Sequence, residues 1–170
     1  MNKEDIETYL RMVGLELHKQ GLTSEILLLG GAVMLIEVGN RKTTDDVDTY
    51  YLPDFVAVTK AAAIVAEREG LEDGWLNSAA AGFTYFFTRE PDKKLWKEFP
   101  GLRVYTASLD YVFVSKLLAH RFKDEVDITA LAERLGLSKQ KDALVLLEKY
   151  VPENAIPQDV LDEIEERFKP

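Results

Sequence analysis

The residues best suited to chemistry lie in one stretch, residues 27–52, which reads LLLGGAVMLIEVGNRKTTDDVDTYYL. Two adjacent glycines, Gly30 and Gly31, follow an apolar run, and a cluster of carboxylates leads into a second apolar run. A Gly-Gly turn between a strand and a helix lets backbone N–H groups and the helix N-terminus approach a phosphate closely. The two glycines are therefore candidates for a phosphate-binding turn.

Asp46 and Asp48 are candidate metal ligands beside such a phosphate. Side chains alternate between the faces of a strand, so these carboxylates should project to the same side, with Cα atoms about 6.6 Å apart. Val47 should then point inward, and Asp45 should be a loop residue. Two such carboxylates can bind one Mg²⁺, with oxygen ligands at about 2.1 Å, and leave positions for water and substrate phosphates. A phosphate turn plus metal carboxylates is the minimum needed for attack on a nucleoside triphosphate.

Each half of this stretch also has a simpler explanation. A Gly-Gly pair after a strand is usually only a tight turn, and an Asp-x-Asp at a strand start is more often solvated or capping. The spacing favours the functional interpretation, because fourteen residues lie between Gly31 and Asp46, which is room for one helix and a return loop.

Hydrophobic periodicity predicts the elements that position these residues. Ile6, Leu10, Val13 and Leu17 have helical spacing, and Gly21 should end that helix. The next elements should be a buried strand at 25–31, a helix at 32–39 ended by Gly39, a strand at 46–52 that stops at Pro53, and a helix at 54–70. This alternation predicts an α/β fold.

The second half of the chain is predicted to be mostly helical. Strands are expected at 82–88 and 102–107, with a charged loop at 89–101 between them. Ser108 is a good N-cap, and the helices that follow should cover 109–122, 124–136, 138–150 and, opened by Pro157, 158–168. We therefore expect an α/β core over residues 1–107 and a helical part over 108–170 that packs on it as one folding unit.

Composition narrows the possible functions of this 170-residue chain. The formal charge of −9 argues against a surface that binds nucleic acid throughout. The sequence has no cysteine and only two histidines, which excludes thiolate chemistry and multi-histidine metal sites. The N-terminus is charged, and the longest apolar run is too short to span a bilayer, so we expect a cytoplasmic protein without membrane contact.

The segment GGAVMLIEVGNRKTTDDVD resembles the signature of minimal nucleotidyltransferases of the DNA-polymerase-β-like superfamily. In that signature a glycine turn precedes a helix and an Arg-x-x-Thr-x-Asp-x-Asp segment. The matching positions are Gly30, Gly31, Arg41, Thr44, Asp46 and Asp48. Residues 101–131 are similar to the second half of the branch related to abortive-infection and toxin–antitoxin toxins. The matching positions there are Lys116, Ala119, Arg121, Lys123, Asp124, Asp127 and Ile128.

The resemblance implies a mixed sheet flanked by helices, with a C-terminal helical extension, and a nucleotidyltransferase activity. Asp46 and Asp48 would hold Mg²⁺, and Lys116 would reach toward phosphates or help to position the acceptor. The nucleotide-binding set would be Gly30, Gly31, Arg41, Thr44, Arg121 and Lys123. The substrate would be an NTP, the acceptor an RNA such as tRNA or a protein hydroxyl, and an antitoxin protein could be a partner.

The match weakens at the third carboxylate that such enzymes normally take from a later strand. Asn77 and Ser78 stand where that acid is expected, and Asp73, Glu90 and Asp110 are near in sequence only. A catalytically degenerate protein that binds a nucleotide or a protein partner, or a one-metal site, is the alternative.

Two further alternatives concern the helical part. Lys116 could simply pair with a carboxylate, and Lys123 could pair with Asp127 at i,i+4. Residues 128–150 also have the form of a helix-turn-helix DNA reader. However, the second helix has few side chains for base edges and an acidic tail follows it, so we do not expect duplex DNA as a partner.

Overall fold

The computed structural model of the chain describes residues 1–52, 55–79 and 87–169. The chain divides into two compact units. Unit 1 comprises Met1–Ala81 and Lys93–Ala107, and unit 2 comprises Gly82–Asp92 and Ser108–Pro170. That residues 1–107 and 108–170 form one folding unit stays a prediction. The strand expected at 82–88 lies almost wholly outside the described residues, as does Pro53.

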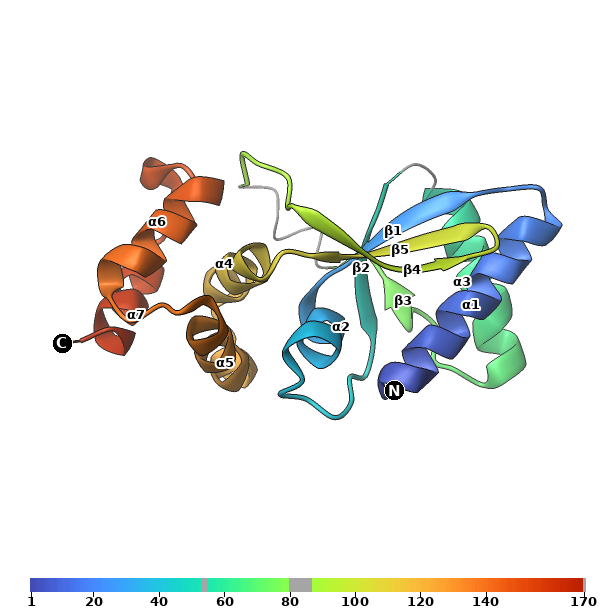
Figure 1. Cartoon of the computed structure of the whole chain (residues 1–170), viewed down its shortest axis with the longest axis horizontal. Coiled ribbons are helices and arrows are strands. Elements are labelled where there is room, and N and C mark those ends of the chain that lie inside the picture. The colour runs from blue at the N-terminus through green and yellow to red at the C-terminus, as the bar shows by residue number, and fades with distance from the viewer. Residues whose placement is uncertain (53–54, 80–86, 170) are drawn as a thin grey trace. The chain divides into compact units, whose positions relative to one another are not determined.

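Unit 1 is built on a five-stranded mixed sheet with the order β3-β2-β1-β5-β4 (Figure 1). The strands are β1 Ser24–Leu28, β2 Val47–Tyr51, β3 Leu76–Asn77, β4 Lys93–Phe99 and β5 Leu102–Ala107. Strand β1 pairs with β2 antiparallel and with β5 parallel, while β2 pairs with β3 parallel and β4 pairs with β5 antiparallel. The predicted fold class, a mixed sheet flanked by helices and followed by C-terminal helices, is confirmed.

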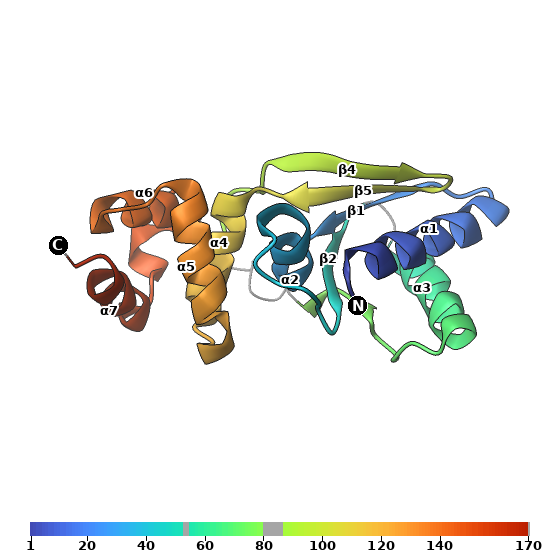
Figure 2. The same ribbon diagram turned by 60° about the horizontal axis from the view of Figure 1, so that its bottom comes forward.

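Two helices of unit 1, α1 (Lys3–Lys19) and α3 (Phe55–Glu69), pack side by side (Figures 1 and 2). The four apolar residues that predicted α1 are all completely buried: Ile6, Leu10, Val13 and Leu17. Gly21 follows the helix with a φ of 69°, a left-handed conformation that suits glycine. The sequence pattern therefore predicted both the buried face and the end of α1.

The helix expected at 32–39 is present but irregular. It begins as α2 (Gly30–Val33) and continues as a π-helical turn, η1 (Met34–Val38), which ends at Gly39 with a φ of 77°. Glu37 of this turn accepts hydrogen bonds from Lys94 Nζ and Thr106 Oγ1, both at 3.0 Å. Burial raises the pKa of Glu37, but these two donors more than offset it, and the pKa lies below its usual value. The turn is thus tied to β4 and β5.

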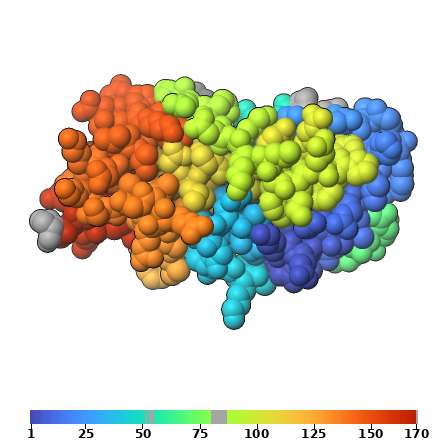
Figure 3. All heavy atoms as spheres, viewed as in Figure 1, coloured from blue at the N-terminus to red at the C-terminus, as the bar shows by residue number. Residues whose placement is uncertain are grey.

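The loop expected at 89–101 is a correction, because its residues Lys93–Phe99 form β4. This strand lies at the edge of the sheet, and its segment reaches the surface in Figure 3 (yellow-green). Lys93, Lys94 and Glu98 are exposed. Edge strands commonly carry charges, which prevent pairing with other chains but hide the alternating pattern of a strand. Lys93 also covers the ring of Tyr105 at 4.3 Å from the centroid.

The part of unit 2 that follows β5, residues 108–169, is mostly helical, as predicted (Figure 2). Its helices are α4 Leu109–Ala119, η3 Phe122–Asp124, α5 Glu125–Leu135, α6 Gln140–Tyr150, η4 Glu153–Ala155 and α7 Gln158–Arg167. Helix α4 ends earlier than expected, because His120 adopts a left-handed conformation with a φ of 43°. Ser108 occupies the N-cap position but makes no capping hydrogen bond with its side chain.

Helices α4 and α6 are joined by a polar contact and an aromatic cluster. Asp110 at the start of α4 accepts hydrogen bonds from Lys149 Nζ and from the Tyr150 hydroxyl, the latter at 2.9 Å. The rings of Phe87, Tyr111 and Tyr150 pack together with centroid distances of 4.7 to 5.9 Å. Within the described ranges, no helix combines the length and the apolar character needed to cross a membrane.

Candidate functional site

The turn from β1 into α2 lies directly against Asp48. The amide of Leu29 donates to the carbonyl oxygen of Asp48 at 2.9 Å, which ties the end of β1 to β2. Gly30 follows with a φ of 52°, and a Cβ added there would lie 2.5 Å from Asp48 Oδ2. Position 30 therefore requires glycine for two reasons: the positive φ, and the space that the Asp48 carboxylate occupies.

The loop between η1 and β2 lies over the second glycine. A Cβ added to Gly31 would lie 2.7 Å from Thr44 Oγ1 and 3.5 Å from Arg41 Nη1. Thr44 is buried, and its hydroxyl donates to the carbonyl oxygen of Asp46 at 3.0 Å. Its amide donates to the carbonyl oxygen of Met1 at 2.9 Å. Residues 41 and 44 thus hold the loop close to the glycine turn.

Asp46 is held by a side chain from β3. Asn77 Nδ2 donates to Asp46 Oδ2 at 3.1 Å, and the parallel register places Asn77 beside Asp48. Val47, between the two aspartates, is completely buried, as predicted, and its amide donates to the carbonyl oxygen of Trp75 at 2.7 Å. Asp45 is exposed.

Unit 1 thus brings together six of the predicted site residues through a chain of direct contacts. Asp48 touches the first glycine, and the loop residues touch the second glycine and the backbone of Asp46. These six are Gly30, Gly31, Arg41, Thr44, Asp46 and Asp48. We refer to them, together with Asn77, as the glycine–aspartate site.

The other three predicted residues belong to unit 2. Lys116 is buried, and its Nζ lies 2.5 Å from Asp124 Oδ1 and 2.8 Å from Asp127 Oδ2. Such a paired lysine is the structural alternative raised by the sequence, and its reach toward phosphates stays a prediction. Arg121 and Lys123 are exposed.

Lys123 does not follow Lys116 on a continuous helix, because His120 ends α4 between them. Lys123 instead belongs to the short helix η3. The binding roles of Arg121 and Lys123 stay predictions.

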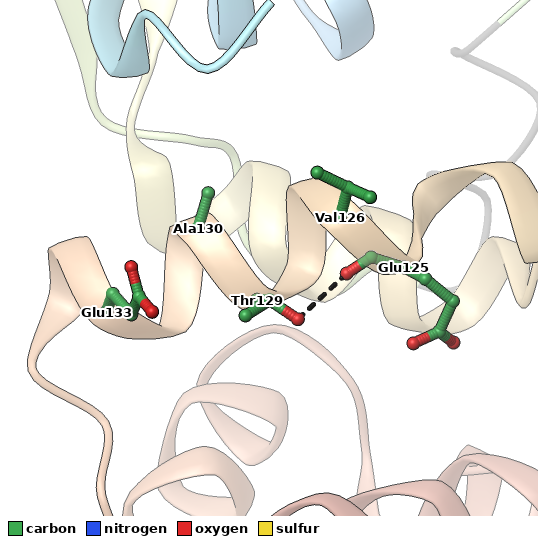
Figure 4. A pocket seen from close by; sticks show the side chains of 5 residues that line it. All are labelled: Glu125, Val126, Thr129, Ala130 and Glu133. Atoms are coloured by element: carbon green, nitrogen blue, oxygen red, sulfur yellow. Dashed lines mark hydrogen bonds between the residues drawn. The ribbon is translucent and has the colours of Figure 1, made fainter.

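An open pocket lies along α5, lined by Glu125, Val126, Thr129, Ala130 and Glu133 (Figure 4). In this lining, the Thr129 hydroxyl donates a hydrogen bond to the carbonyl oxygen of Glu125 at 3.0 Å. The lining carries two glutamates and no cationic side chain, so it is unsuited to a triphosphate. None of the predicted site residues lines it.

The contact of Asn77 with Asp46 could not be predicted from the sequence. The sequence marked Asn77 only as standing where an acid is expected. Strand β3 has two residues, Leu76 and Asn77, which is too short to show the period of a strand. Only the position of β3 beside β2 shows that Asn77 reaches Asp46.

A mixed sheet flanked by helices is the fold that the sequence resemblance implied for a nucleotidyltransferase, and in it the glycine turn lies against Asp48. Comparison with protein families agrees: the model described as "Nucleotidyltransferase of unknown function (DUF6036)" matches residues 10–151. The chain belongs to this family. No curated protein and no solved structure matches the chain.

Proposed function

We propose that this protein is a Mg²⁺-dependent nucleotidyltransferase that moves a nucleoside monophosphate from an NTP to a hydroxyl group of an RNA or a protein. The observation that carries the proposal is the contact between Asp48 and Gly30, which sets a carboxylate against the backbone where α2 begins. Membership of a nucleotidyltransferase family supports the same reaction class. The acceptor would be an RNA such as tRNA, or a protein hydroxyl, and the labelled product of the test below distinguishes the two.

The residues of the glycine–aspartate site fit Mg²⁺ by their chemistry. Asp46 and Asp48 offer carboxylate oxygens, which are the ligands that Mg²⁺ prefers in proteins. The Cβ that Gly30 lacks leaves room for the Asp48 carboxylate at the start of α2. When bound, Mg²⁺ would neutralise charge on the phosphates and orient them for displacement.

In the reaction we propose, the acceptor hydroxyl attacks the α-phosphorus of the NTP in line with the leaving group. A new oxygen–phosphorus bond forms, the bond between the α-phosphorus and the bridging oxygen breaks, and pyrophosphate leaves as the hydroxyl loses its proton. Gly30 and Gly31 face the triphosphate through their backbone. Thr44 and Arg41 keep the loop in place, and Asp46 and Asp48 hold the metal. Lys116, Arg121 and Lys123 remain candidates for contacts to phosphate or acceptor.

A biological role as the toxin of a toxin–antitoxin pair, with an antitoxin protein as partner, is part of this proposal. It rests on the resemblance of residues 101–131 to that branch. Inhibition of growth when the protein is produced alone, and its absence with Asp48→Asn, would support this role.

The second candidate function is a catalytically degenerate protein that binds a nucleotide or a protein partner. One observation favours it: within the ranges 1–52, 55–79 and 87–169, no three Asp, Glu or His side chains are grouped as metal ligands. Of the internal residues outside these ranges, Asp54 carries a carboxylate and residues 80–86 carry none. Metal-dependent NTP binding without turnover would favour this candidate.

The test is the transfer of label from each α-labelled NTP, with Mg²⁺, into total cellular RNA and protein. We expect one labelled product with the wild-type chain and at least a 100-fold loss with Asp48→Asn, a scale typical of removing a group that acts on the transition state. Asp45→Asn is the matched control, because Asp45 is the exposed neighbour in the loop and should keep the activity. Equal labelling by wild type and Asp48→Asn would contradict the proposal.

A further inference from the structure

Hydrogen bonds hold both the oxygen and the nitrogen of the Asn77 side-chain amide, and they determine which way the amide points. Its Oδ1 accepts a hydrogen bond from the backbone amide of Ala79 at 2.8 Å. Its Nδ2 faces two acceptors, Asp46 Oδ2 at 3.1 Å and the carbonyl oxygen of Gly74 at 3.2 Å. The opposite assignment of oxygen and nitrogen would oppose a donor to a donor and an acceptor to two acceptors.

The backbone around Asn77 is also held in place. The hydroxyl of Thr49 donates to the carbonyl oxygen of Asn77 at 3.0 Å, and Thr49 is completely buried in β2. Asp48 precedes Thr49 and is paired with Asn77 in the register, and Asp46 stands immediately before β2. The amide therefore acts on Asp46 from a rigid position.

The N–H group of Asn77 lies where two oxygens converge, Asp46 Oδ2 and the carbonyl oxygen of Gly74. An aspartate at this position would add a third oxygen, and three converging oxygens attract a divalent cation. The neutral amide instead satisfies both acceptors by donating to them. It also leaves the protein with two carboxylates at the site, whose charge of −2 balances one divalent cation.

We infer that Asn77 is a positioning residue that orients Asp46 and restricts the protein's own ligands to a single divalent cation. This inference rests on the proposed function, because it concerns the metal that Asp46 and Asp48 would hold. Partners that orient a metal ligand typically contribute 10- to 100-fold to metal affinity. Asn77, which stands where an acid is expected, thus has a role of its own: it orients the Asp46 carboxylate.

The experiment is titration of the intact chain with Mn²⁺ alone, with free Mn²⁺ measured by electron paramagnetic resonance. We expect one bound equivalent for wild type, one equivalent with a Kd weakened about 10- to 100-fold for Asn77→Ala, and two equivalents for Asn77→Asp. Ser78→Ala changes the neighbouring polar residue, directly after β3, and serves as the matched control. It should bind Mn²⁺ like wild type. A merely structural Asn77 would not change the stoichiometry.

The outcomes separate this inference from the proposed function. Two equivalents on wild type, an unchanged Kd for Asn77→Ala, or a single equivalent for Asn77→Asp would each overturn the inference while leaving the metal site standing. Mn²⁺ binding that is absent, or that is equal in wild type and Asp48→Asn, would overturn the metal role of the proposed function and the inference with it. Circular dichroism of each variant confirms that it is folded.

Discussion

Gly30 combines a backbone requirement and a steric requirement at one position. Its φ of 52° is unfavourable for residues with a Cβ, and a Cβ there would also meet the Asp48 carboxylate at 2.5 Å. Gly39 has a similar positive φ, 77°, but nothing within 4 Å of an added Cβ. Both glycines have a positive φ, but only Gly30 contacts the site, so the pair can be compared by substitution.

We expect Gly39→Ala to lower the free energy of unfolding by about 1 to 2 kcal/mol, the cost of the backbone conformation, without changing Mn²⁺ affinity. Gly30→Ala should cost more and should also weaken Mn²⁺ binding, because the Asp48 carboxylate must move. Denaturant unfolding and Mn²⁺ titration measure the two effects. Equal effects of both substitutions on metal affinity would mean that Gly30 does not position Asp48.

At the scale of elements, a buried ion cluster joins α4 to α5. Lys116 lies on α4 and contacts Asp124, at the end of η3, and Asp127, within the first turn of α5. All three side chains are at least nine-tenths buried. Removing one member of a buried ion pair leaves an uncompensated charge, which is costly, whereas an exposed lysine contributes little.

We expect Lys116→Met to lower the free energy of unfolding by about 3 to 5 kcal/mol. Lys123→Met should stay within about 0.5 kcal/mol, since Lys123 is exposed. Chemical denaturation measures both. A Lys116→Met protein that is as stable as wild type but inactive in nucleotide transfer would instead support the predicted contact of Lys116 with phosphate.

Asp110 provides a pH-dependent link between α4 and α6. Burial raises the pKa of Asp110, but the donors from Lys149 and Tyr150 more than offset this and keep the pKa below its usual value. A carboxyl group with a lowered pKa stabilises the fold above its unfolded pKa of about 3.9, and this contribution is lost as pH falls through the folded pKa.

We therefore expect Asp110→Asn to lower stability by about 1 to 3 kcal/mol at pH 7, and this difference from wild type should shrink as pH falls below about 4. Thermal unfolding of the whole chain between pH 7 and pH 3 measures this. Glu148→Gln, an exposed carboxyl group next to Lys149, should follow the wild-type profile. A constant difference between Asp110→Asn and wild type at every pH would rule out this linkage.

At the scale of the whole molecule, net charge bears on the choice of partner. The chain carries 30 acidic and 21 basic residues, a formal charge of −9. Duplex DNA is bound mainly through phosphate contacts by clustered lysine and arginine. In α6, the second helix of the would-be helix-turn-helix, Ala143 and Leu147 are buried and the last turn carries Lys149, which pairs with Asp110.

We expect no mobility shift of random duplex DNA at about 150 mM salt with micromolar protein, since non-specific binding by basic proteins has a Kd near 10⁻⁴ to 10⁻⁶ M. A salt-sensitive shift under these conditions would favour the helix-turn-helix alternative over the nucleotidyltransferase. Labelled transfer into RNA with the same preparation gives the positive control.

The sequence alone determined the α/β class, the buried face of α1 and the helices that end at glycine, and it predicted a glycine turn near two aspartates. These features depend on residue type and on hydrophobic periodicity, both of which can be read from residues that are close in sequence. The charged edge strand β4 escaped prediction because its stability comes from the β5 ladder, not from its own pattern.

Only the tertiary structure decided which distant residues meet. The Asp48 carboxylate lies against Gly30, and Asn77 donates a hydrogen bond to Asp46, 31 residues away in sequence. Lys116 pairs with two carboxylates, those of Asp124 and Asp127. Each of these contacts depends on strand register or helix packing, which no local pattern encodes. The sequence therefore identified the acids of the glycine–aspartate site, and the fold showed what holds them in place.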